Sequence, residues 1–257
     1  MVSRTLLASI ALVFGLLGGA TAGERPRAFL ELFTSQGCAS CPAADKMVRA
    51  LDDEDGVFAV TMPVKLWDFL GWADTLATVK ATKRQMAYSI TRGDRDVYTP
   101  QVVLNGVEDL LGNDRAAIGA AIAAHAPDPL PVPIDLSVGD NVLHISVGPA
   151  GEAARAGGRD LEASLWMLVV EERLQVPVRG GENRGRKLTY YNVVRQMRPV
   201  GVYKGKRMTF DLPLSDVEKG ARAGCFVIAQ VETFKGPGRI IGAARVDRLF
   251  PARTVAR

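Results

Sequence analysis

Two cysteines separated by two residues, Cys38 and Cys41, are the side chains of this sequence best suited to covalent chemistry. They follow an apolar run, residues 28–34, that is typical of a buried strand, and they precede a stretch with helical spacing. The pair is therefore expected at a helix N-terminus, where free N–H groups and a partial positive charge favour a thiolate over a thiol. This placement predicts thiol–disulfide exchange, with Cys38 as the nucleophile and Cys41 as the residue that resolves the mixed disulfide.

The same cysteine pair has two simpler interpretations. The first is a structural disulfide that closes the start of the helix, although so short a loop contributes little entropic stabilisation. The second is a metal site, which the sequence does not favour because no histidine or third cysteine lies nearby in the chain. The remaining cysteine, Cys225, lies in an apolar run and is most simply a buried free thiol. We expect no bound metal and no dissociable cofactor.

Glu31 is an acidic residue inside the apolar run that precedes the cysteines. In an alternating strand it shares a face with two phenylalanines, and a buried carboxylate has a raised pKa. We therefore expect Glu31 to be a catalytic residue, the proton acceptor for Cys41. The alternative is that Glu31 forms an ion pair with an arginine such as Arg84 or Arg92.

A second signal is the dipeptide Thr99-Pro100, which directly precedes the apolar run 101–104. Proline is tolerated at the first residue of a strand, and X-Pro bonds adopt the cis form far more readily than other peptide bonds. A C-x-x-C at a helix start, combined with Thr-Pro before the third strand, resembles the thioredoxin-like superfamily, in which a cis-proline loop faces the cysteines. This resemblance implies that Thr99 and Pro100 bind an incoming polypeptide substrate.

The resemblance extends to a narrower family. The segments that carry it are residues 31–45, 66–72, 97–101, 181–188 and 191–195. They are similar to an exported bacterial family of unassigned function, called domain of unknown function 1223. The family implies a thioredoxin-like domain followed by a C-terminal β domain, with a redox role inferred from that fold. By the same resemblance, Trp67 and Asp68 are expected near the cysteines as substrate-binding residues.

The N-terminus has the features of a secretory signal peptide. Arg4 precedes an apolar run that is shorter than the ~20 residues a spanning helix needs, and Ala20-Thr21-Ala22 suits signal peptidase. Residues 1–22 are therefore predicted to be cleaved, so that the mature protein is periplasmic or secreted and has no stable membrane insertion. Such a compartment permits disulfides that the cytosol would reduce.

The periodicity of the remaining chain changes at a proline-rich stretch. Alternating strand and helix patterns predict an α/β domain over residues 24–126, which the resemblance above implies is thioredoxin-like, with a helix over 75–90 and a later helix capped by Asn113. Four prolines in residues 127–133 predict a stiff linker. Beyond it, seven short alternating runs with glycine-rich turns predict an all-β, sandwich-like domain over residues 134–250.

The charge of the chain argues against nucleic-acid binding. The 257 residues include 32 Lys and Arg against 28 Asp and Glu, a net charge of +4, and the basic residues are scattered among acidic ones. Nucleic-acid binding requires a clustered basic surface, so no nucleic-acid partner is expected. The predicted partners are a protein thiol or disulfide substrate and, as a further candidate, a membrane redox partner.

A function of a different class remains open. A non-catalytic periplasmic binding or scaffold protein would keep a permanent disulfide and would bind its partner in a groove between the two domains. The polar, glycine-flanked residues 182–187 fit either function, as a solvated connector or as a partner-docking loop at the domain interface.

Overall fold

The computed structural model describes residues 25–127, 130–155, 161–217 and 223–249, and the predicted signal peptide, residues 1–22, lies outside them. Within these ranges the chain forms eleven β-strands, three α-helices and three short 3-10 helices. The first half contains β1 (Ala28–Thr34), α1 (Cys41–Asp52), β2 (Val57–Pro63), η1 (Asp68–Leu70), α2 (Val79–Arg92), β3 (Gln101–Leu104), β4 (Glu108–Leu111) and α3 (Arg115–His125). The second half contains β5 (Ile134–Gly139), β6 (Val142–Val147), η2 (Glu152–Arg155), β7 (Ala163–Pro177), β8 (Lys187–Tyr203), β9 (Met208–Pro213), η3 (Leu214–Asp216), β10 (Ala223–Thr233) and β11 (Gly236–Val246).

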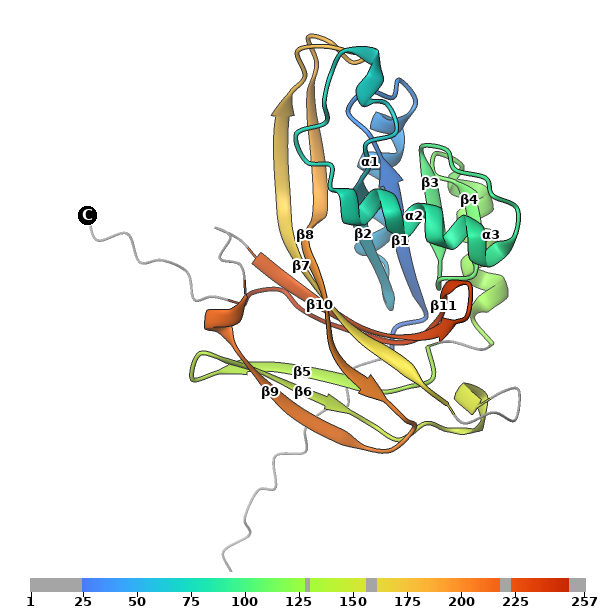
Figure 1. The fold of residues 1–257 in the computed structure, drawn as a ribbon, viewed down its shortest axis with the longest axis vertical. Helices are drawn as coiled ribbons and strands as arrows, with labels where there is room; N and C mark the ends of the chain where they lie inside the picture. Colours follow the sequence, from blue (N-terminus) through green and yellow to red (C-terminus); the bar gives the residue numbers. More distant parts are fainter. Residues whose placement is uncertain (1–24, 128–129, 156–160, 218–222, 250–257) are drawn as a thin grey trace, which may run out of the picture.

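Most strands belong to one eight-stranded sheet, in the order β11-β10-β7-β8-β2-β1-β3-β4 (Figure 1). β1 and β2 run parallel, whereas β3 is antiparallel to β1 and to β4. The long antiparallel hairpin of β7 and β8 continues the sheet beyond β2, and β8 joins β2 in parallel at Thr61 and Val193. A separate three-stranded sheet, β5-β6-β9, lies below β10 and β11 in Figure 1.

The expected architecture, an α/β thioredoxin-like domain followed by an all-β sandwich-like domain, is wrong. The described chain is mostly β, and strands of both halves pair in one large mixed sheet that is accompanied by only three α-helices. The physical reason lies at β2, whose outer edge would expose unpaired N–H and C=O groups if the sheet ended there. β8 covers that edge, and Thr61 Oγ1 donates a 2.6 Å hydrogen bond to the Tyr191 carbonyl oxygen.

The hydrophobic core is continuous across the two halves. One cluster contains Phe29 of β1 and Tyr88 of α2 together with Leu168 of β7, Phe226 of β10 and Ile240 of β11. Phe29 and Phe226 meet edge to face, with ring centroids 5.9 Å apart. A second cluster fills the space between the other face of β1 and the helices α1 and α3. Residues of both halves therefore bury apolar surface in one shared core. The hydrophobic effect thus stabilises the two halves as a single unit.

The three-stranded sheet and the proline-rich segment pack against the second half of the large sheet. A third cluster joins Ile145 of β6 and Leu165 of β7 with apolar residues of β10 and β11. In the proline-rich segment, Leu130 and Val132 are buried, and the Val132 N–H donates a 2.7 Å hydrogen bond to the Ile241 carbonyl oxygen. This segment therefore runs along β11 and is held there by backbone and side-chain contacts.

Local periodicity placed the strands well and misplaced some helix ends. β1 and β3 have the predicted bounds. α2 begins at Val79, later than expected, because the Thr78 side chain caps it by accepting a backbone N–H of the first turn. α3 is capped in the same way by Asp114 and not, as expected, by Asn113. β7 and β8 are longer than their alternating runs indicated, because their outer ends pair with each other in the hairpin.

Candidate functional site

Cys38 and Cys41 form a disulfide at the start of α1, with their Cα atoms 5.4 Å apart. β1 leads directly into this turn, and Pro42 occupies the first turn of the helix, where its missing N–H costs no hydrogen bond. Cys38 is 2% exposed and Cys41 is fully buried, so Cys38 is the sulfur nearer the surface. The Ser40 hydroxyl lies 3.5 Å from Cys38 Sγ.

Thr99, Pro100 and Trp67, three of the four residues predicted to bind substrate, lie beside this disulfide. The Thr99–Pro100 bond is cis, and the Thr99 carbonyl oxygen is 3.6 Å from Cys38 Sγ. Trp67 Nε1 donates a 2.6 Å hydrogen bond to Thr99 Oγ1. A Cβ added at Gly37 would be 2.9 Å from the Trp67 Cβ, so a glycine is needed immediately before Cys38. The structure therefore brings Thr99, Pro100 and Trp67 to the surface-side cysteine.

Asp68 supports the same turn through an intermediate residue. Its Oδ1 accepts the Asp74 N–H at 3.0 Å, and Asp74 Oδ2 accepts the Gln36 N–H at 2.7 Å. Gln36 is fully buried, and its Oε1 accepts a 2.8 Å hydrogen bond from Trp72 Nε1. Through Asp74, Asp68 therefore helps to position the turn before Cys38. Asp74 and Gln36 were not predicted as site residues, because neither has a recognisable spacing from the cysteines.

The loop between β7 and β8, residues 178–186, lies directly on the cysteine turn and is called here the β7–β8 tip. Asn183 is fully buried, and its Nδ2 donates hydrogen bonds to the carbonyl oxygens of Gln36 and Cys38, at 3.0 and 2.7 Å. Arg186 Nη1 donates to Asn183 Oδ1 at 2.7 Å, which fixes the orientation of the amide. The tip therefore binds the site of its own chain and is more than a solvated connector.

Glu182 makes a further contact between the tip and the turn. Its Oε2 accepts the Ala39 N–H at 2.8 Å, although 143 residues separate the two in the sequence. Ala39 directly follows Cys38, so an exposed carboxylate lies beside the disulfide. Motif spacing could not reveal this contact, because only the long β7–β8 hairpin brings Glu182 to the start of α1.

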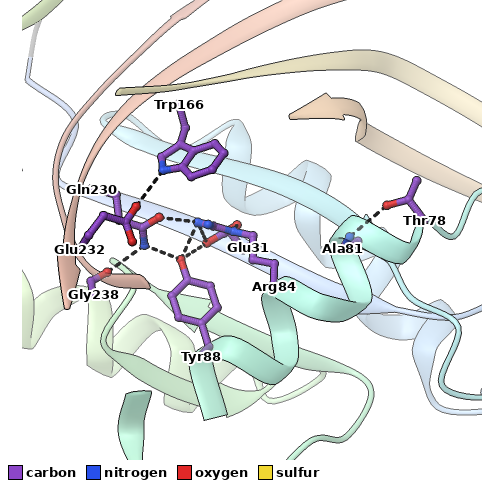
Figure 2. Close-up of polar contacts among 9 residues, drawn as sticks. All are labelled: Glu31, Thr78, Ala81, Arg84, Tyr88, Trp166, Gln230, Glu232 and Gly238. Carbon is purple, nitrogen blue, oxygen red and sulfur yellow. Dashed lines mark hydrogen bonds and ion pairs between the residues drawn. The ribbon is translucent and has the colours of Figure 1, made fainter. Parts of the chain in front are cut away.

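Glu31 belongs to a separate buried network, drawn in Figure 2. Arg84 Nε and Nη2 donate to the two carboxylate oxygens at 2.6 and 2.9 Å, and the Tyr88 hydroxyl donates to one of them. Gln230 of β10 accepts from Arg84 and donates to the Tyr88 oxygen. Of the two expectations for Glu31, the ion pair is therefore the one that forms. Alternation along β1 places Glu31 on the face that packs against α2, whereas Cys41 belongs to α1 on the other face.

A buried carboxyl group does lie near Cys41, and it is that of Asp45. Asp45 follows Cys41 by four residues on α1, so the two share one side of the helix. Its Oδ1 accepts a 2.7 Å hydrogen bond from Thr34 Oγ1, and burial raises its pKa. Among the described residues, Asp45 Oδ2 and the Tyr190 hydroxyl have no hydrogen-bond partner. The pKa of Tyr190 is raised by burial and by the nearby charges of Asp45 and Asp74.

Comparison with protein families identifies the wider group. Residues 29–230 match the family described as Protein of unknown function (DUF1223). The chain belongs to this family. The match begins in β1 and ends in β10, so it includes the cysteine turn and the β7–β8 tip. The family expected from the sequence motifs is thus confirmed.

Two solved structures are similar to this DUF1223 member. One is the crystal structure of protein AGR_C_4864 from Agrobacterium tumefaciens, with 32% identity, a TM-score of 0.75, and coverage of 87% of this chain and 95% of that chain. The other is HBP35 of Porphyromonas gingivalis, with 14% identity, a TM-score of 0.61, and coverage of 91% and 78%, which shows a likeness of fold alone. No curated protein matches the chain.

The third cysteine of this DUF1223 member takes no part in the disulfide. Cys225 is a buried free cysteine, as expected, and burial raises the pKa of its thiol to about 12. No group of three or more His, Cys, Asp or Glu side chains that could hold a metal ion is found among the residues described by the structure. In the same ranges, none of the helices has the length and apolar character needed to cross a membrane.

Replacing Asp45 with asparagine is expected to reduce the pH dependence of folding stability. Burial raises the folded-state pKa of Asp45, so the folded protein keeps a proton that the unfolded chain loses as pH rises. This contribution to stability is complete below the unfolded pKa of ~3.9 and declines as pH rises through the folded pKa. The free energy of unfolding in urea should therefore fall less for Asp45→Asn than for the unmodified protein between about pH 4 and about pH 8.

Asp94→Asn is a control, because the contribution of Asp94 to folding stability changes with pH in the opposite direction. A hydrogen bond from Arg92 lowers the pKa of the exposed Asp94, so its small contribution is present at neutral pH and is lost as pH falls. This variant should lose a little stability at neutral pH and none in acid. A pH profile of Asp45→Asn that runs parallel to that of the unmodified protein would contradict a proton on Asp45 in the folded state.

Proposed function

We propose that this chain catalyses thiol–disulfide exchange through Cys38 and Cys41. The observation that carries the proposal is the position of the disulfide, at the N-terminus of α1 with Cys38 Sγ 3.6 Å from the Thr99 carbonyl oxygen. The helix N-terminus favours a Cys38 thiolate in the reduced protein. The Thr99 backbone next to that sulfur can hydrogen-bond an extended polypeptide, which would hold a substrate disulfide beside the nucleophile.

The exchange proceeds in two steps. The Cys38 thiolate attacks one sulfur of a substrate disulfide, the substrate S–S bond breaks, and the other substrate sulfur leaves as a thiolate. Cys41 then loses its proton and attacks Cys38 Sγ, which forms the Cys38–Cys41 disulfide and releases the second substrate sulfur. Two electrons pass to the substrate, whose sulfurs take up one proton from Cys41 and one from water. Asp45, a buried carboxyl group one helical turn away, is the group best placed to exchange the Cys41 proton.

We further propose that this exchange takes place outside the cytoplasm, in the periplasm or after secretion. The signal-like sequence of residues 1–22 supports this location, and a disulfide is compatible with it. The proposed substrate of the exchange is a protein thiol or disulfide. A membrane redox partner would return the cysteines to their starting state, and no dissociable cofactor is required.

Cysteine variants test the proposed reaction. Cys38→Ser should lose all exchange with a protein disulfide, because it lacks the attacking sulfur. Cys41→Ser should accumulate a mixed disulfide with the substrate, visible on a non-reducing gel, because Cys38 still attacks and nothing resolves the product. Cys225→Ser, which alters a buried thiol outside the site, is the control and should keep full activity. Equal exchange by all three variants and the unmodified protein would contradict the proposal.

A non-catalytic binding or scaffold protein with a permanent disulfide is the second candidate function. The burial of Cys38, which is only 2% exposed, favours it. The reduction potential of the pair separates the two candidates, because structural disulfides of exported proteins lie below about −300 mV and redox sites lie above that value. Equilibration with dithiothreitol and glutathione buffers, followed by alkylation of free thiols, measures this potential.

A further inference from the structure

The β7–β8 tip brings a carboxylate to the positive end of the helix that carries the disulfide. Glu182 Oε2 accepts the Ala39 N–H at 2.8 Å, immediately after Cys38 in the chain. Asn183 holds the same turn through two carbonyl oxygens, at 3.0 and 2.7 Å, and is itself fixed by Arg186 at 2.7 Å. The tip therefore presents Glu182 to the cysteine turn in a defined position.

This contact affects the reduced protein more than the oxidised one. When the disulfide opens, the Cys38 thiolate needs the free N–H groups at the start of α1. Glu182 already accepts the N–H of Ala39, and its negative charge repels a second negative charge nearby. Both effects oppose the thiolate, and neither acts on the uncharged disulfide.

Most other charged groups around the turn form hydrogen bonds with other partners, whereas Arg179 and Arg184 of the tip are exposed. On α1, Asp45 is buried and bound to Thr34. In the segment before α2, Asp74 accepts backbone N–H groups and Asp68 accepts the N–H of Asp74. On the tip, Arg186 donates to Asn183, and at the start of β3 the turn faces the uncharged Thr99-Pro100. Among the described residues, Glu182 is therefore the exposed carboxylate in direct contact with the cysteine turn.

We propose that Glu182 is a positioning residue of the redox site and that its negative charge, held at the Ala39 N–H, shifts the Cys38–Cys41 equilibrium toward the disulfide. The inference rests on the proposed exchange function, but it concerns an equilibrium that can be measured without a protein substrate. Reduction by two glutathione molecules yields the Cys38 thiolate, the Cys41 thiol, one glutathione disulfide and one proton released to water. Two electrons pass from glutathione to the cysteine pair, and removal of the Glu182 charge favours these products.

The test compares Glu182→Gln with the unmodified protein. Glutamine keeps an oxygen that can accept the Ala39 N–H and removes the charge. The equilibrium constant for reduction by glutathione should rise about two- to fivefold, the size of a charge effect near a helix end. This corresponds to about 9–21 mV, since a tenfold change is 29.6 mV. Alkylation rates at several pH values should show a lower pKa for Cys38, and the difference in equilibrium constant should vanish at pH values where Cys38 is an uncharged thiol.

Glu162→Gln is the matched control. Glu162 is also an exposed carboxylate, paired with Lys204 at 3.7 Å, and it lies at the opposite end of the β7–β8 hairpin from the tip. An equilibrium constant for Glu182→Gln equal to that for Glu162→Gln would overturn the proposal, and so would a shift that is the same at every pH. Failure of the unmodified protein to exchange disulfides with proteins would overturn the proposed function instead. The equilibrium constants of the two variants with glutathione could still be compared in that case.

Discussion

Replacing Arg84 with methionine is expected to destabilise the folded protein by about 3–5 kcal/mol, the usual cost of leaving one member of a buried ion pair without its partner. Arg84 is 8% exposed in its side chain and Glu31 is fully buried, and the two are joined by two hydrogen bonds. Methionine fills a similar volume but donates nothing. The Glu31 carboxylate would then keep the Tyr88 hydroxyl as a donor and lose both bonds to the guanidinium.

A double variant shows whether the loss comes from the uncompensated charge. Glu31→Leu/Arg84→Met replaces both ions with apolar side chains, which is often neutral or stabilising for buried pairs. Gln230 Oε1 loses its bond from Arg84 in both variants, so recovery should be incomplete. Urea denaturation should give the double variant a higher free energy of unfolding than Arg84→Met. A double variant as unstable as the single one would assign the loss to packing around α2.

Gly106→Ala is the second substitution with a large expected effect, about 2–5 kcal/mol of lost stability. Gly106 has φ of +73°, and an added Cβ would overlap the Gly238 carbonyl oxygen of β11 and lie 3.1 Å from Gln230 Nε2. The preceding Asn105 bonds β1 through its backbone N–H and β11 through its carbonyl oxygen. The change therefore pushes apart the contact at which the first half of the chain meets β11.

Gly93→Ala separates the backbone effect from the steric effect. Gly93 also has a positive φ, +90°, but an added Cβ there would have no atom within 4 Å. Only the cost of the left-handed conformation applies, about 1–2 kcal/mol. Thermal or urea denaturation should thus give a clearly larger loss for Gly106→Ala. Equal losses for the two variants would mean that β11 moves away from the turn at no cost.

The cysteine pair and its local surroundings could be predicted from the sequence because they depend on short-range features. A strand that leads into Cys38-x-x-Cys41, and a proline in the first turn of the helix, are visible as periodicity and residue type. The Thr99-Pro100 dipeptide marked the start of β3 in the same way, and the structure places it beside Cys38. Asp45 also has a local signal, its spacing of four residues from Cys41.

The supporting residues of the site could not be predicted, because their partners are distant in the sequence. Glu182 and Asn183 reach the turn only because β7 and β8 form a long hairpin. Alternation placed Glu31 on a strand face with two phenylalanines but could not choose among the partners of that face, and α2 supplied Arg84. A buried carboxylate needs a cation beside it, and only the packing of the elements determines which side chain supplies that cation.

The sequence by itself determined the approximate positions of strands and helices and which two cysteines can pair, because period, turn residues and helix-start residues act over a few neighbours. The tertiary structure alone decided that β8 pairs with β2, which joins the two halves in one sheet. An alternating pattern identifies a strand and its buried face, but it says nothing about which strand lies alongside. That choice depends on covering the open edge of β2 and on a core to which both halves contribute.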